Sequence, residues 1–233
     1  MNGVILEIIL GASAAILAIT LHEAAHGYAA WALGDDTARL AGRLSLNPLR
    51  HIDRVGTIIL PAILLIGQLI TVGRVAFMFG WAKPVPVAAW RFRDPRRGMM
   101  LVAAAGPAMN FFLAWLGALG GWLLPYITPQ AMAPAATFIQ DFILANVVLG
   151  LFNLLPIPPL DGGRIIVGLL PLPLAQQWAR MERAGIAIVM LLIFIVPVAA
   201  RQLGWQFDPV GTLLNRVVPW TMRLVFNLAG QSV

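Results

Sequence analysis

The chain has 233 residues, of which 60% are hydrophobic and 11% are charged, and its mean hydropathy is +0.83. Soluble domains carry about 25% charged residues, so this composition excludes an ordinary water-soluble domain and predicts a membrane protein. The net charge is +6 and there is no cysteine, which excludes disulfides and thiolate metal sites and leaves histidine and carboxylates as possible metal ligands.

Hydrophobic runs approach the roughly 20 apolar residues that a transmembrane helix needs at 4–33, 55–72, 99–124, 133–155 and 184–200. A sixth run, 210–228, contains two arginines and a proline and can either span the membrane or lie in its interface. No basic segment precedes the first run, so we expect no cleavable signal peptide. The runs predict an all-α polytopic membrane protein, surrounded by lipid, with five to six transmembrane helices.

The stretch 73–90, between the second and third runs, contains FGWAKPVPV, which is apolar but too short and too rich in proline to span as a helix. We expect a short membrane-embedded β-like segment here. Irregular or extended backbone is tolerated at membrane depth only where protein covers it.

Arginines follow the first run, precede the third, and lie between the fourth and fifth. Cytoplasmic loops of membrane proteins carry an excess of Lys and Arg, so we expect these clusters on the cytoplasmic side of the cell membrane, beside the ends of the first and fourth helices. They form no basic helix with interleaved aromatics, so we expect no nucleic-acid partner. The clusters are Arg39, Arg43, Arg50 and Arg54; Arg91, Arg93, Arg96 and Arg97; and Arg164, Arg180 and Arg183.

The first run contains HEAAH, an H-E-x-x-H motif made by His22, Glu23 and His26. Residues i and i+4 share one face of a helix, so both imidazoles can bind one Zn²⁺. Glu23 lies about 100° round the helix axis from His22, which suits a general base acting on a metal-bound water better than a third ligand. The alternative is a polar trio satisfied by neighbouring helices, as in a proton relay, because unpaired polar groups are costly in hydrocarbon.

Catalytic zinc sites usually have three protein ligands, and Asp161 is the strongest candidate for the third. It follows the fourth run in FNLLPIPPLDGGR, where prolines break the helix and a Gly-Gly pair allows a tight turn. His51 lies in a loop, Glu7 lies about four turns before His22, and Asp141 lies near the predicted outer side. The alternative is that Asp161 is a solvated residue at an ordinary helix end.

Together, HEAAH and FNLLPIPPLDGGR on separate transmembrane helices resemble the site-2 protease family of intramembrane zinc metalloproteases. GPAMN (106–110) fits that family's G-x-x-x-N element. LNPLRHID, FGWAKPVPV and FRDPRRGMMLVAAAGP are similar to its compact prokaryotic branch, and the chain shows no PDZ or CBS domain. The resemblance covers about residues 15–170, and it implies that the segment at 73–90 receives substrate as an added strand.

The resemblance also implies one Zn²⁺ per chain and a carboxylate base. The zinc ligands are then His22, His26 and Asp161, and the base is Glu23. Asn110 and Asn153 match the family's helix asparagines. Each is expected to donate a hydrogen bond to a developing oxyanion or a substrate strand, or else to join helices through an interhelical hydrogen bond.

We therefore expect a single domain over 1–233, with a catalytic core at about 4–170 and C-terminal helices at about 184–230. The expected activity is hydrolysis of peptide bonds in or near transmembrane helices of substrate proteins, by zinc-activated water with Glu23 as the base. Two alternatives are a transporter or proton relay that uses the same polar residues, and an inactive homologue that binds membrane proteins. The oligomeric state is left open.

Overall fold

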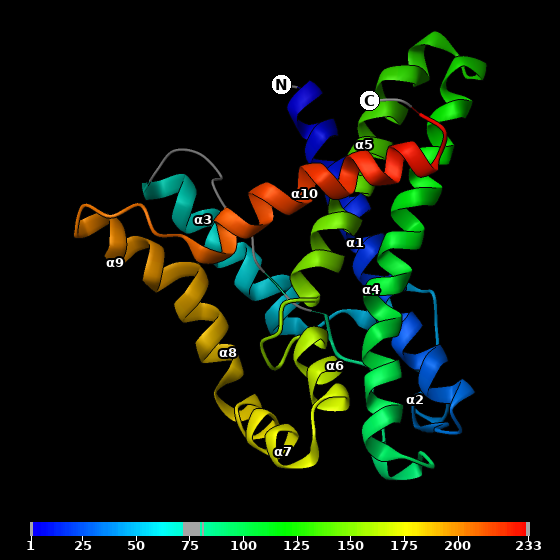
Figure 1. The fold of residues 1–233 in the computed structure, drawn as a ribbon. Coiled ribbons are helices and arrows are strands. Elements are labelled where there is room, and N and C mark those ends of the chain that lie inside the picture. Colours follow the sequence, from blue (N-terminus) through cyan, green and yellow to red (C-terminus); the bar gives the residue numbers. More distant parts are fainter. Residues whose placement is uncertain (1, 72–79, 81, 232–233) are drawn as a thin grey trace.

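The computed structural model describes residues 2–71, 80 and 82–231, and all regular secondary structure within them is helical (Figure 1). The longest helices are α1 (Asn2–Ala32), α4 (Pro95–Gly120), α5 (Pro129–Asn153) and α10 (Pro209–Leu228). The shorter ones are α2 (Thr37–Leu40), α3 (Leu60–Thr71), α6 (Asp161–Leu169), α7 (Leu172–Arg180), α8 (Glu182–Met190) and α9 (Val196–Gln202). Short 3₁₀ or π helices are η1 (Pro48–His51), η2 (Arg54–Ile59), η3 (Ala89–Arg91), η4 (Gly121–Tyr126) and η5 (Leu191–Ile195).

Within the described residues, four helical segments are long and apolar enough to cross a membrane. They are Ile5–Ala32, Pro95–Tyr126, Pro129–Asn153 and Ala184–Gln202. These segments correspond to the first, third, fourth and fifth hydrophobic runs, and they confirm the prediction of an all-α polytopic membrane protein.

The second run is helical but shorter than the others. The chain passes from the π helix η2 directly into α3, and the apolar part of this helix covers Arg54–Gln68.

The sixth run forms α10, which lies across α4 and α5 (Figure 1). Trp115 of α4 donates its indole N–H to the carbonyl of Leu228 at 3.2 Å, and Trp122 donates to that of Ala229 at 2.9 Å. These two bonds satisfy carbonyls at the end of α10, which have no partner inside the helix. The end of α10 is thereby fixed against α4.

Helices α1, α4 and α5 pack against one another at the centre of the molecule, and α6 packs against α4 (Figure 1). Lipid is as apolar as a protein core, so membrane helices associate through close contact between small residues rather than through hydrophobic burial. Alanines buried in these helices include Ala14, Ala18, Ala24, Ala103, Ala114 and Ala118. The close packing brings polar side chains of the three helices within hydrogen-bonding distance.

The predicted β-like segment at 73–90 is not confirmed. Residues 72–79 and 81 lie outside the described residues, and residues 82–88 form neither helix nor strand. Pro84 and Pro86 have no backbone N–H to donate and would lie on the same edge of an extended strand, so that edge could not pair. The N–H groups of Lys83 and Val85, on the other edge, donate to the carbonyl of His51 and to Glu23 instead of to a strand.

Candidate metal centre

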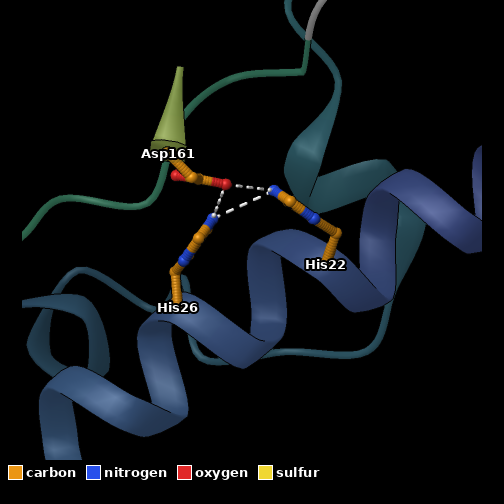
Figure 2. Close-up of side chains that lie close together, drawn as sticks. All are labelled: His22, His26 and Asp161. Carbon is orange, nitrogen blue, oxygen red and sulfur yellow. Dashed lines mark hydrogen bonds and ion pairs between the residues drawn. The ribbon is translucent and has the colours of Figure 1, made fainter. Parts of the chain in front are cut away.

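His22 and His26 project from one face of α1 toward Asp161 at the start of α6 (Figure 2). His22 and Asp161 are buried, with 5% and 7% of their surfaces exposed. The i, i+4 spacing on α1 places the two imidazoles one turn apart, as the motif predicts.

Asp161 reaches the histidines because the chain turns tightly between α5 and α6. A Cβ at Gly162 would lie 2.3 Å from the carbonyl oxygens of Leu154 and Leu155, and one at Gly163 would lie 2.5 Å from the nitrogen of Pro158. Only glycine allows the start of α6 to approach the preceding loop this closely. The Gly-Gly pair therefore sets the position of the Asp161 carboxylate.

The three side chains bring three ligand atoms together. The Nε2 atoms of His22 and His26 are 3.0 Å apart, and Asp161 Oδ2 lies 3.1 Å from the first and 3.3 Å from the second. Tetrahedral zinc with bonds of 2.0–2.2 Å separates its ligand atoms by roughly 3.3–3.6 Å. The three observed separations are within a few tenths of an ångström of these values. Among the described residues, His22, His26 and Asp161 form a group of possible metal ligands whose ligand atoms all lie within 4.8 Å of one another.

Hydrogen bonds on the far side of each imidazole fix its tautomer. Nδ1 of His26 lies 2.7 Å from the carbonyl oxygen of Val102, which can only accept, and Nδ1 of His22 lies 2.6 Å from Oδ1 of Asn110. A neutral imidazole that donates from Nδ1 has a lone pair on Nε2. Both lone pairs then face each other and the carboxylate, an arrangement suited to a divalent cation and typical of metal-binding histidines.

Gly106 of α4 completes the pocket around the histidines. A Cβ at this position would lie 2.5 Å from Cε1 of His26 and 2.6 Å from Cε1 of His22. The backbone of α4 can approach the two rings this closely only because Gly106 has no side chain.

Glu23 lies beside the pair on α1 and contacts the stretch that precedes α4. Its Oε2 accepts a hydrogen bond from the backbone N–H of Val85 at 3.1 Å. The Glu23 residue is only partly buried, unlike His22 beside it.

Asn110 is fully buried and both ends of its amide are engaged. Its Oδ1 accepts from His22, and its Nδ2 donates to Oδ1 of Asn146 at 2.9 Å. Asn146 in turn donates to the carbonyl of Phe142 at 2.8 Å. Asn146 was not predicted as a site residue, although an asparagine inside an apolar run is a recognisable signal.

The remaining candidate residues lie apart from His22, His26 and Asp161 or have other hydrogen-bond partners. Asn153, at the end of α5, donates to the carbonyl of Leu149 one turn earlier at 3.1 Å. His51 is buried and its Nε2 lies 2.8 Å from the carbonyl oxygen of Ser45, so it orders the loop after α2. Asp141 lies against α1, where a Cβ at Gly11 would be 3.5 Å from its Oδ2.

Comparison with known proteins places this site in a family. The family model of peptidase family M50 matches residues 119–196, which include Asp161. YwhC of Bacillus subtilis (strain 168), whose name describes a zinc metalloprotease, is 41% identical over 189 residues, which are 79% of this chain and 80% of YwhC. The chain belongs to peptidase family M50.

Other proteins named as zinc metalloproteases are similar over most of the chain. Rip2 of Mycobacterium tuberculosis (strain ATCC 25618 / H37Rv), also named as a zinc metalloprotease, is 29% identical over 93% of this chain and 73% of Rip2. Rip2 of Mycolicibacterium smegmatis is 32% identical over 84% of this chain and 69% of its own length. No solved structure matches the chain. Membership of M50, the site-2 protease family, confirms the resemblance seen in the sequence and makes the protein a membrane-embedded zinc metalloprotease.

Proposed function

We propose that this M50 protein hydrolyses peptide bonds in or near the transmembrane helices of substrate proteins, with one Zn²⁺ held by His22, His26 and Asp161. The convergence of the two Nε2 atoms and Asp161 Oδ2 carries the proposal. Three electron-pair donors this close together repel one another unless a metal ion or a proton lies among them, and both Nδ1 atoms are already engaged by acceptors, which leaves the Nε2 lone pairs for a metal ion.

The residues around the triad support hydrolysis rather than metal storage. Bound Zn²⁺ supplies a water of lowered pKa and polarises a carbonyl group. In our proposal Glu23 takes the proton from the attacking water and then gives it to the leaving amide nitrogen. The backbone N–H of Val85 donates a hydrogen bond to Oε2 of Glu23 and so orients the carboxylate.

The two family asparagines have different surroundings, and we propose different roles for them. Asn110 acts through His22, because its amide is engaged by His22 and Asn146. Asn153 remains the proposed donor to an oxyanion or a substrate strand.

We further propose that the protein lies in the cell membrane with the active site toward the cytoplasm. The turn after α1, the start of α4 and the α6–α7 region lie at the same end of the molecule (Figure 1). These are the arginine-rich segments, which favour the cytoplasmic side.

The substitution Glu23→Gln tests the general base. Gln keeps the size and polarity of the side chain but cannot accept the proton. Bound zinc should therefore stay at about one equivalent per chain, while the rate of cleavage falls by several orders of magnitude. Purified protein in detergent would be assayed for metal content and for cleavage of a panel of single-span membrane proteins. Glu7→Gln, on the exposed N-terminal part of α1, is the matched control and should cleave normally. Normal cleavage by Glu23→Gln would refute the base role.

The substitution Asp161→Asn tests the third ligand. The neutral amide is a much weaker zinc ligand than a carboxylate, so zinc content should fall sharply. Asp141→Asn, which removes an intramembrane carboxylate away from the histidines, should keep its zinc. Full zinc occupancy in Asp161→Asn would assign the third ligand to another residue.

A further inference from the structure

Residues 82–88 are attached to α1 and to the turn that follows it by two carboxylates. Near the metal centre, Val85 N–H donates to Oε2 of Glu23 at 3.1 Å; farther along, Ala88 N–H donates to Oδ2 of Asp35 at 2.6 Å. Between these two points α1 presents Gly27, where a Cβ would lie 3.2 Å from Cγ1 of Val85. The stretch therefore lies directly on the helix that carries the HEAAH motif.

Asp35 is a fully buried carboxylate that the proposed mechanism does not use. Its Oδ1 accepts from Thr37 N at 3.0 Å and from Thr37 Oγ1 at 2.5 Å, and its Oδ2 accepts from Ala88. Burial acts to raise the pKa of Asp35, but the hydrogen bonds from Thr37 and Ala88 and the nearby Arg91 outweigh it and lower this pKa. The side chain is thus an ionised anchor with several donors around it.

The tether between Ala88 and Val85 is short and stiff. It contains Pro86, which fixes its own φ and restricts Val85 before it to extended conformations. Only Pro86 and Val87 therefore separate the anchored N–H of Ala88 from the N–H of Val85 that donates to Glu23.

We propose that Asp35 is a positioning residue of the protease, which holds Ala88 so that Val85 N–H stays on Glu23 and keeps this carboxylate beside the histidine pair. The inference rests on the proposed role of Glu23. Asp35 contacts neither the metal ligands nor Glu23, so its effect passes through the backbone of 85–88.

The neighbouring Asp36 provides a matched control. It carries the same charge one residue later, is only partly buried, and pairs with Arg39 and Arg91. Among the described contacts, none joins its side chain to the backbone of residues 82–88.

A disulfide cross-link measures the position of the stretch without relying on catalysis. The chain has no cysteine, so Gly27→Cys and Val85→Cys would supply its only two thiols, which a thiol oxidant such as diamide then joins. A Cβ at Gly27 would also lie 3.1 Å from Cδ1 of Leu44, the flexible end of a side chain that must shift slightly. With Asp35 present we expect fast cross-linking. Adding Asp35→Ala should slow it by about tenfold or more, whereas adding Asp36→Ala should leave the rate unchanged. Equal rates in the Asp35→Ala and Asp36→Ala backgrounds would overturn the proposal.

Activity and metal content are measured on variants that lack the cysteines. Asp35→Ala should keep its zinc and lower kcat by roughly ten- to a hundredfold, because a small misplacement of a catalytic group is this costly, while KM changes little. Val85→Pro, which removes the N–H donated to Glu23, should lower kcat similarly. If both act through one contact, the double variant is no slower than the slower single variant.

Several outcomes would overturn this role. Normal kcat in Asp35→Ala despite slow cross-linking, or a double variant whose losses multiply, would show that Asp35 does not act through Val85. If Asp35→Ala fails to fold, Asp35→Asn, which keeps the volume and one acceptor oxygen, should give an intermediate kcat; wild-type kcat would refute the proposal. Failure of the base role appears separately, as normal cleavage by Glu23→Gln.

Discussion

Gly106 lies where any side chain would press on the two histidines of the candidate metal centre. We expect Gly106→Ala to weaken zinc binding by about ten- to a hundredfold, because the new Cβ would lie 2.5–2.6 Å from ring atoms of His22 and His26 and must displace them. Equilibrium competition with a chelator would measure the affinity. Gly120→Ala on the same helix is the control, since its Cβ would meet only Ile139 Cδ1 at 3.8 Å. Equal affinities for Gly106→Ala and the native protein would contradict this interpretation.

For single residues, the sequence predicts positions that follow from spacing along one helix. His22 and His26 share a helix face by their spacing alone, and the structure does bring Asp161 beside them. Asp35 and Asn146 could not be predicted in the same way. Their partners Ala88 and Asn110 are 53 and 36 residues away in the chain, so their roles depend on how the helices pack.

Among the elements, a row of hydrogen bonds joins three helices behind the metal centre. It runs from His22 on α1 through Asn110 on α4 to Asn146 on α5. Polar pairs inside a membrane bundle contribute modestly to helix association, but here they also fix the orientation of a proposed ligand. Helix packing and metal binding should therefore be coupled.

Substituting leucine for each asparagine tests this coupling. Asn110→Leu leaves Nδ1 of His22 without its acceptor and should lower zinc affinity by about a hundredfold, whereas Asn146→Leu removes only the support behind Asn110 and should cost about tenfold. Asn153→Leu should bind zinc normally, since its side chain donates to its own helix, and should lose activity if Asn153 contacts substrate. Chelator competition and cleavage assays separate these effects, and equal zinc affinity in Asn110→Leu and Asn153→Leu would contradict the coupling.

The elements themselves were predictable to the extent that length and hydropathy determine them. Four of the hydrophobic runs form helices suited to span a membrane. The place of α10 across α4 and α5 was not predictable, because it depends on contacts such as those made by Trp115 and Trp122. The stretch 82–88 is held by hydrogen bonds to the side chains of Glu23 and Asp35, and at Lys83 by the carbonyl of His51 and the side chain of Arg43. No pattern of alternating residues reveals these contacts.

At the scale of the whole molecule, its two ends differ in charge. The loop after α1 and the η4 turn that connects α4 to α5 lie toward opposite ends (Figure 1). The first is rich in arginine, while η4, with the sequence GWLLPY, has no charged residue. The distribution favours the first in the cytoplasm, and the metal centre, beside the end of α1, would then face that side.

Labelling of single cysteines in the naturally cysteine-free chain would determine this orientation. Leu49, after α1, and Tyr126, at the end of η4, are 72% and 86% exposed, so Leu49→Cys and Tyr126→Cys should disturb the fold little. In intact cells a membrane-impermeant maleimide should label the cysteine at 126 but reach the one at 49 only after permeabilisation, because positively charged loops are retained inside. The native chain, which has no thiol, gives the background. The opposite pattern would place the metal centre toward the outer face, and the substrate bond cleaved would then lie near the outer end of its helix.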